Sequence, residues 1–112
     1  MNISTLIRES HRTASDHGWW EGEQNFAEKL ALVHSEISET LEEFRNGHNL
    51  DEIYFDESKS HEKPEGVPVE LADALIRIFD MAGYWGINLE AALRLKMAYN
   101  KKRPYRHGGK KC

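Results

Sequence analysis

The sequence predicts an all-α protein, a four- to five-helix bundle in one domain that spans residues 1–112. Apolar residues recur at intervals of three and four, and no segment alternates apolar and polar residues as a strand does. Asparagine, glycine and proline stand where the periodic segments begin and end. With 39% hydrophobic and 30% charged residues, the chain has the composition of a folded domain with a small core. We therefore expect it to oligomerise through helix packing.

The first two predicted helices have well-marked boundaries. The first extends from about Ser4 to Asp16, and Gly18 ends it. Asn25, with Glu28 three residues later, is typical of a capping box and opens the second helix, which ends at residues 46–47. The apolar face of this second helix is the most regular in the sequence and consists of Phe26, Leu30, Val33, Ile37, Leu41 and Phe44.

A polar insertion separates the second helix from the third. Residues 48–67 combine Pro, Gly, Ser and mixed charge, so we expect a loop with at most one short helical turn. Pro68 suits the first position of the third helix, which is predicted to run to about Trp85 and to end at Gly86. Asn88 then caps the fourth helix, and a basic tail follows over residues 104–112. The residues of the third helix that are predicted to face inward are Leu71, Leu75, Ile78, Phe79 and Ala82.

The charge distribution is compatible with an anionic ligand, and the single cysteine suits the cytoplasm. The net charge is −4, yet residues 91–112 contain eight Lys or Arg and no acid. Such a block usually forms a solvated tail, and here it could also meet an anionic ligand. Cys112 is the only cysteine, so no internal disulfide can form, as expected in the cytoplasm. No apolar segment is long enough to span a membrane and no secretory signal is visible, so we expect a cytoplasmic protein without a membrane partner.

Two pairs of carboxylates stand three residues apart on predicted helices, Glu36 with Glu39 and Glu70 with Asp73. Side chains at this spacing share a helix face, with Cβ atoms about 5–6 Å apart. Each pair flanks an apolar face, so packing of the two apolar faces would turn the pairs toward one another. Four carboxylates repel unless cations compensate them, and oxygen ligands without His or Cys favour Mg²⁺, with Mn²⁺ as an alternative. An acidic helix face is usually only solvated, and the two pairs alone leave that interpretation open.

Three segments resemble the MazG-like family of all-α nucleoside triphosphate pyrophosphohydrolases: EKLALVHSEISETLEEFRNG, VELADALIRIFDMAGYWGINLE and KMAYNKKRPYRHGGK. The motif of that family is ExxE, a spacer and ExxD, both on helices, and the resemblance covers residues 29–110. It implies that Glu36, Glu39, Glu70 and Asp73 are metal ligands. The sequence departs from the family pattern in its long spacer, which contains the polar insertion around residues 56–65.

The resemblance also implies an activity and an assembly. Its members hydrolyse ribo- or deoxyribonucleoside triphosphates between the α and β phosphates with Mg²⁺, which yields a monophosphate and pyrophosphate and suits house-cleaning of the nucleotide pool. Glu39 is the first candidate for the catalytic proton acceptor, and the sequence does not separate it from Glu36. Phosphoryl transfer needs positioning and charge stabilisation, so no covalent nucleophile is required. Related enzymes pair into homodimers or homotetramers.

Several residues are candidates for binding the nucleotide. Lys96, Asn100 and Arg103 recur three or four residues apart and could donate hydrogen bonds to phosphate oxygens, a role that the resemblance supports. Lys29 lies two turns before the ExxE motif and could also reach phosphate, with an ordinary surface lysine as the equal alternative. Trp20 is a candidate for stacking on the nucleobase, with core packing as its alternative.

Three further residues are expected to have structural roles. Trp19 and Trp85 are expected to pack in the core. Arg77 is expected to orient the acids as an ion-pair partner.

Two other functional interpretations stay open. The chain could be a non-catalytic helical dimer whose basic tail binds a partner or a nucleic acid, although we otherwise expect no nucleic-acid partner. It could also be a sibling all-α enzyme, either a dUTPase or a phosphoribosyl-ATP pyrophosphohydrolase. Substrate profiling separates the enzymes from one another.

Overall fold

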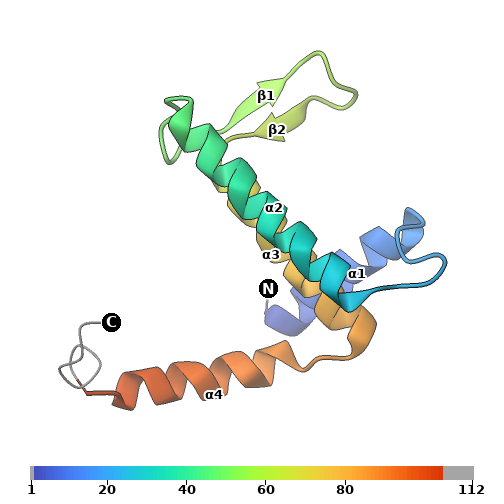
Figure 1. Ribbon diagram of the computed structural model, residues 1–112, viewed down its shortest axis with the longest axis vertical. Coiled ribbons are helices and arrows are strands. Elements are labelled where there is room, and N and C mark those ends of the chain that lie inside the picture. Colours follow the sequence, from blue (N-terminus) through green and yellow to red (C-terminus); the bar gives the residue numbers. More distant parts are fainter. Residues whose placement is uncertain (1, 105–112) are drawn as a thin grey trace.

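A computed structural model describes residues 2–104 as four helices and one small antiparallel sheet (Figure 1). The two strands pair with each other and are inserted between the second and third helices. The elements are α1 (Ile3–Asp16), α2 (Phe26–Arg45), β1 (Tyr54–Asp56), β2 (Lys63–Glu65), α3 (Val67–Trp85) and α4 (Leu89–Lys102). The mostly helical class that the sequence predicts is confirmed.

Asparagine side chains cap three of the four helices. Each accepts a hydrogen bond from the backbone N–H three residues later, which satisfies a donor that has no partner within the helix. Gly86 ends α3 in the left-handed conformation, with φ at 65°, where a side chain would be strained. The three capping contacts are Asn2 to Thr5 at 2.8 Å, Asn25 to Glu28 at 3.0 Å and Asn88 to Ala91 at 3.1 Å.

Helix α3 is the centre of the fold, because both α1 and α2 pack against it. In Figure 1, α2 runs alongside α3 over most of their length. α1 approaches α3 closely at Gly83, where an added Cβ atom would lie 2.7 Å from the Cβ of His11. The buried apolar side chains of the described residues all belong to α3, and they are Val67, Ala74, Phe79, Met81 and Ala82.

The residues expected to face inward on the third helix do so only in part, and most of the apolar face of the second helix is exposed. Phe79 and Ala82 are buried as expected, but Leu71 and Leu75 are exposed. On α2, Val33 is half-buried, whereas the other five residues of the predicted apolar face are exposed. The reason is the rotation of α2 about its axis, which places Glu36 rather than the apolar face against α3. Periodicity shows which side chains share a face, but it does not show what that face contacts.

The insertion at residues 48–67 is also different from the expected loop. β1 and β2 form an antiparallel hairpin in which Tyr54 pairs with Glu65 and Asp56 pairs with Lys63. The backbone of Gly66 passes so close to the carbonyl oxygen of Glu52 that any side chain there would collide with it. Strands of three residues are too short to display the alternation from which a sequence predicts them.

Helix α4 extends away from the other helices (Figure 1). It contains no buried residue, and its packing is with α1, where Glu90 Oε1 accepts a hydrogen bond from the backbone N–H of Ser4 at 3.3 Å. No helix in residues 2–104 combines the length and apolar character that crossing a bilayer requires. Of the predicted basic tail, residues 105–112 lie outside the described part of the chain.

Candidate metal centre

Three carboxylates meet where α2 lies against α3. Glu36 comes from α2, and Glu70 and Asp73 come from successive turns of one face of α3. One oxygen of each lies within 4.8 Å of the others. Glu36 and Glu70 are only 7% and 9% exposed, so the site is at the contact between the two helices and not on a solvated face.

Burial and mutual repulsion favour the protonated forms of two of these acids. Burial raises the pKa of Glu70 to about 7, helped by a hydrogen bond with Glu39 and by the negative charges of Glu39, Asp73 and Glu36. Burial also raises the pKa of Asp73 above its ordinary value, and the charge of Glu36 adds to this effect, whereas Arg77 opposes it. Without a compensating cation, the fully ionised cluster is therefore unfavourable at neutral pH.

Arg77 compensates one member of the cluster. Its Nε donates a hydrogen bond to Glu36 Oε1 at 2.7 Å, and this is the ion pair with the acids that the sequence predicts for Arg77. A guanidinium held this way fixes the position of the Glu36 carboxylate. Among residues 2–104, no Lys or Arg forms an ion pair with Glu70.

The chemistry of the cluster fits a hard divalent cation. Glu70 Oε2 is buried and has no hydrogen-bond partner among the described residues, which is costly unless a ligand occupies the space beside it. The donor set consists of carboxylate oxygens alone, as Mg²⁺ prefers. Glu39, the fourth predicted ligand, is exposed and stands outside the group of three, although it lies close enough to Glu70 to form a hydrogen bond with it.

The acidic cluster opens into a groove of about 850 Å³, which we call the acidic groove. Its lining comes from α1, α2 and α3, together with Trp19 and with Lys63 from β2. Its volume is in the range of small-molecule sites. Its charged lining residues are Glu9, Glu36, Glu39, Lys63, Glu70, Asp73, Arg77 and Asp80.

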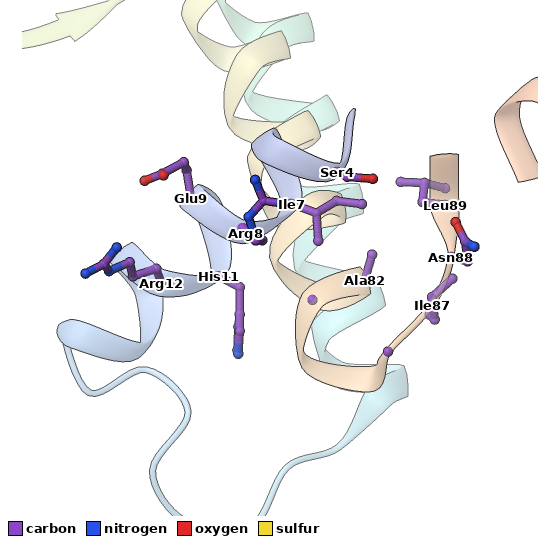
Figure 2. A pocket seen from close by; sticks show the side chains of 12 residues that line it. Ser4, Ile7, Arg8, Glu9, His11, Arg12, Ala82, Ile87, Asn88 and Leu89 are labelled. Atoms are coloured by element: carbon purple, nitrogen blue, oxygen red, sulfur yellow. The ribbon is translucent and has the colours of Figure 1, made fainter. Parts of the chain in front are cut away.

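A second groove, of about 700 Å³, lies between α1 and the joint of α3 with α4 (Figure 2). Figure 2 shows Ile7 pointing toward this joint, whereas Glu9 and Arg12 point away from it. Glu9 is the only carboxylate among its lining residues, so this groove lacks a set of oxygen ligands for a metal. The candidate chemistry is therefore in the acidic groove.

Trp20 is held in an aromatic cluster. Its ring stacks on Tyr84 with the centroids 4.0 Å apart and meets the edge of Trp85. Its Nε1 donates a hydrogen bond to Asp80 at 2.7 Å, and the ammonium group of Lys29 lies 4.6 Å from the ring centroid. These contacts agree with the packing alternative for Trp20, and its role in base stacking stays a prediction.

Trp19 has the opposite surroundings. Contrary to the packing role expected for it, its side chain is 58% exposed, and it lines the acidic groove. Trp85 packs as expected, against Trp20, Tyr84 and Phe26.

The basic residues predicted to bind phosphate do not line the acidic groove of their own chain. Lys29 lies over Trp20, and Lys96 lies over the ring of Tyr99 at 4.8 Å from its centroid. Lys96 and Asn100 are exposed on α4, and Arg103 follows the last residue of that helix. Their role in phosphate binding stays a prediction, because within one chain they lie outside the lining of the acidic groove.

Sequence reasoning missed two features of the groove. Lys63 belongs to an insertion without periodicity, so no local signal places it beside the acids. Asp80 accepts hydrogen bonds from Trp20 and, at 2.9 Å, from Nδ1 of His11, both distant in the sequence. The one available signal for Asp80 was its position two turns after Asp73 on the acidic flank of the third helix.

Comparisons of the chain with models of protein families, with curated proteins and with solved structures gave no match. The functional conclusion therefore depends on the site. The site consists of a carboxylate cluster that could hold a metal ion, in a groove with the volume of a small-molecule site and with an exposed indole in its lining.

Proposed function

We propose that this chain is an all-α, MazG-like nucleoside triphosphate pyrophosphohydrolase. It would use Mg²⁺, or Mn²⁺ in its place, to cleave a nucleoside triphosphate between the α and β phosphates, releasing a monophosphate and pyrophosphate. The observation that supports this most is the buried, unpartnered oxygen of Glu70 beside Glu36 and Asp73. Buried carboxylates that repel one another, one of them with an oxygen that accepts no hydrogen bond, are the arrangement that a hard cation stabilises.

We assign a separate role in the reaction to each of several residues of the acidic groove. Glu36, Glu70 and Asp73 would hold Mg²⁺, with Glu39 at the edge of the site. When bound, the ion would neutralise charge on the triphosphate and make the attacking water more acidic. Arg77 keeps the Glu36 carboxylate oriented through its 2.7 Å hydrogen bond. Glu39 is exposed to the groove and close to Glu70, so it is the residue best placed to accept the proton of the attacking water.

The nucleobase end of the substrate fits Trp19 better than Trp20. Both are near the end of α1, but the Trp20 ring is occupied by Tyr84 and Lys29, whereas Trp19 is exposed in the acidic groove. An exposed indole stacks on any base, which suits an enzyme that removes unwanted nucleotides from a cytoplasmic pool.

We further propose that a second copy of the chain supplies the basic phosphate-binding residues. Lys96 and Asn100 are exposed on a helix that extends away from the acidic groove of the same chain. In a homodimer or homotetramer, α4 of one copy could reach the groove of another. Arg103, at the end of that helix, would accompany them.

Product analysis tests the proposed activity directly. The purified chain is incubated with Mg²⁺ and each common and several modified ribo- and deoxyribonucleoside triphosphates, and the products are separated by ion-exchange chromatography. We expect a monophosphate and pyrophosphate from wild type and no product from the Glu36→Gln and Asp73→Asn variants. Glu42→Gln, an exposed carboxylate on the same helix, serves as the matched control and should remain active.

The other outcomes separate the alternatives. A diphosphate with inorganic phosphate would contradict cleavage between the α and β phosphates. Exclusive turnover of dUTP or of phosphoribosyl-ATP would identify one of the sibling enzymes. No turnover of any nucleotide, with a melting temperature that does not respond to Mg²⁺, would favour the non-catalytic helical dimer.

A further inference from the structure

The β1–β2 hairpin is attached to the end of α2 by specific contacts. The hydroxyl of Tyr54 donates to the two carboxylate oxygens of Glu43, at 2.8 and 3.0 Å. The ring of His48 stacks on Tyr54 with the centroids 4.7 Å apart, and the same His48 pairs with Glu43 and Glu52. The segment that the sequence alone leaves without a role is therefore held in one place beside the acidic groove.

Lys63 is the hairpin residue that reaches this groove. It stands in β2, and it lines the groove together with the metal-site acids. Its ion pair with Glu65 is long, at 3.6 Å, and the Lys63 side chain is 57% exposed. An exposed, loosely held lysine can reorient toward a ligand at little cost.

Of the two Lys or Arg residues that line the groove, Lys63 has the longer and more exposed ion pair. Arg77, the other Lys or Arg among the lining residues, is committed to Glu36 at 2.7 Å. The ring of His17 donates to the carbonyl oxygen of Thr13 at 2.8 Å within its own helix. A triphosphate bound in this groove carries more negative charge than a divalent ion neutralises, and Lys63 is the described residue available to meet the remainder.

The position of Lys63 along the groove indicates which phosphates it meets. Lys63 precedes the first residue of α3 by four positions, whereas Trp20, the neighbour of Trp19, contacts Tyr84 and Trp85 at the other end of that helix. The metal-site acids of α3 lie between these two ends. With the nucleoside at Trp19 and the reacting phosphate at the acids, the terminal phosphates point toward the hairpin.

We propose that Lys63 binds the β and γ phosphates of the substrate and the pyrophosphate product, so that the hairpin selects triphosphates over monophosphates. This inference depends on the proposed function, since it assigns the leaving-group end of the same site. The contact exists before, during and after bond cleavage, so it contributes to binding of substrate and product more than to the chemical step.

The test compares Lys63→Ala with Lys59→Ala and Lys63→Arg. Lys59 lies in the turn of the same hairpin and does not line the acidic groove, so its variant is the matched control. We expect Lys63→Ala to raise KM for a triphosphate and to weaken binding of inorganic pyrophosphate with Mg²⁺, measured by titration calorimetry, each about five- to tenfold. The value of kcat should stay within about twofold of wild type. Lys59→Ala should match wild type, and Lys63→Arg should restore most of the affinity.

Each other result has a defined meaning. Unchanged KM and unchanged pyrophosphate affinity in Lys63→Ala, with an active wild type, overturn the role of Lys63 and leave the proposed function intact. A fall in kcat without weaker pyrophosphate binding overturns it equally. A wild-type chain that neither hydrolyses nucleotides nor binds pyrophosphate overturns the proposed function and this inference together. Circular dichroism of each variant excludes misfolding as the cause.

Discussion

Glu70 combines, in a single residue, the strongest indications of a ligand. A carboxylate that is 9% exposed, with one oxygen unpartnered and three other acids nearby, is destabilising when ionised. Such an arrangement is retained in a small domain when a bound cation compensates it. With the proposed cation, the same residue would link the stability of the fold to pH and to metal.

The first prediction follows from the pKa of Glu70. Without metal, Glu70 keeps its proton up to about pH 7 in the folded chain, whereas the unfolded chain loses it near its ordinary pKa of 4.5. The folded state therefore binds more protons between these values, and the free energy of unfolding falls as pH rises through this window. Millimolar Mg²⁺ should restore stability above the window and have little effect below it. Melting temperatures measured across this pH range with Mg²⁺ or EDTA provide the check.

Glu70→Gln isolates the contribution of this carboxylate. The variant should lose most of the decline of stability between about pH 4.5 and 7, with a smaller decline left from Asp73, and should no longer respond to Mg²⁺. Glu42→Gln, which replaces an exposed carboxylate of α2, should retain both responses. A wild-type melting temperature that is insensitive to Mg²⁺ above neutral pH would contradict the assignment of a metal site.

The second prediction concerns the Arg77–Glu36 ion pair. Removing the guanidinium in Arg77→Met leaves Glu36, which is 7% exposed, without its cation. We expect a loss of about 2 kcal/mol of unfolding free energy, less than for a fully buried pair because Arg77 is partly exposed. Urea denaturation measures the loss. Adding Glu36→Gln to this variant should recover part of the stability, and strictly additive losses would argue against a direct interaction.

At the scale of elements, two adjacent tryptophans at the junction between α1 and α2, Trp19 and Trp20, lie in different surroundings. Trp20 connects this junction to α3 through Asp80 and Tyr84, whereas Trp19 remains exposed in the acidic groove. The contacts of Trp20 are those of a packed residue, whereas Trp19 is the one that we propose for binding, the opposite of the order in which the sequence ranks them.

The third prediction separates the two tryptophans. Trp19→Ala should raise KM for nucleotides roughly tenfold, since stacking contributes about 1–3 kcal/mol per base. It should leave the affinity for pyrophosphate and the melting temperature close to wild type. Trp20→Ala should instead lower the melting temperature, because it removes a stacked ring and leaves Asp80 with one donor fewer. A nucleotide-binding defect confined to Trp20→Ala would restore Trp20 as the base-stacking residue.

The elements that the sequence predicts best are those with local signals. The capping bonds of Asn25 and Asn88 and the left-handed Gly86 lie within three residues of the helix ends that they define. The hairpin has no such signal, because its anchor joins Tyr54 to Glu43 across eleven positions and its strands have three residues each. Its existence depends on tertiary contacts that composition and periodicity do not encode.

The residues of the candidate site could likewise be predicted only where the sequence signal is local. The spacing of three residues shows that Glu70 and Asp73 share a face, and the structure brings Glu36 to them. Lys63 could not be predicted, since its approach to the acids depends on where the hairpin folds. The rotation of α2 could not be predicted either. An apolar helix face can be buried against another helix of the same chain or against another copy of the chain, and the sequence does not distinguish the two.

At the scale of the whole molecule, the chain has a larger accessible surface than a compact monomer of its mass is expected to have. Its accessible surface is 8875 Å², whereas a folded monomer of 13.0 kDa is expected to expose about 6,300 Å². Its radius of gyration is 17.0 Å, compared with about 13 Å for a compact domain of this length. The apolar face of α2 is largely exposed, and α4 contains no buried residue. A helix of fourteen residues with so few contacts is marginally stable by itself.

The fourth prediction is that two copies of the chain together complete each site. Light scattering at micromolar concentration should give a dimer or tetramer, and a monomer would contradict this. Mixing, after joint unfolding and refolding, a Glu70→Gln chain with a chain carrying Lys96→Ala and Asn100→Ala then tests where α4 acts. Each variant alone should be inactive or nearly so. If α4 acts on a second copy, a mixed dimer contains one site with intact acids and an intact α4 helix, and about a quarter of the wild-type activity returns. If α4 acts on its own chain, no mixed site is complete and activity stays at the level of the separate variants.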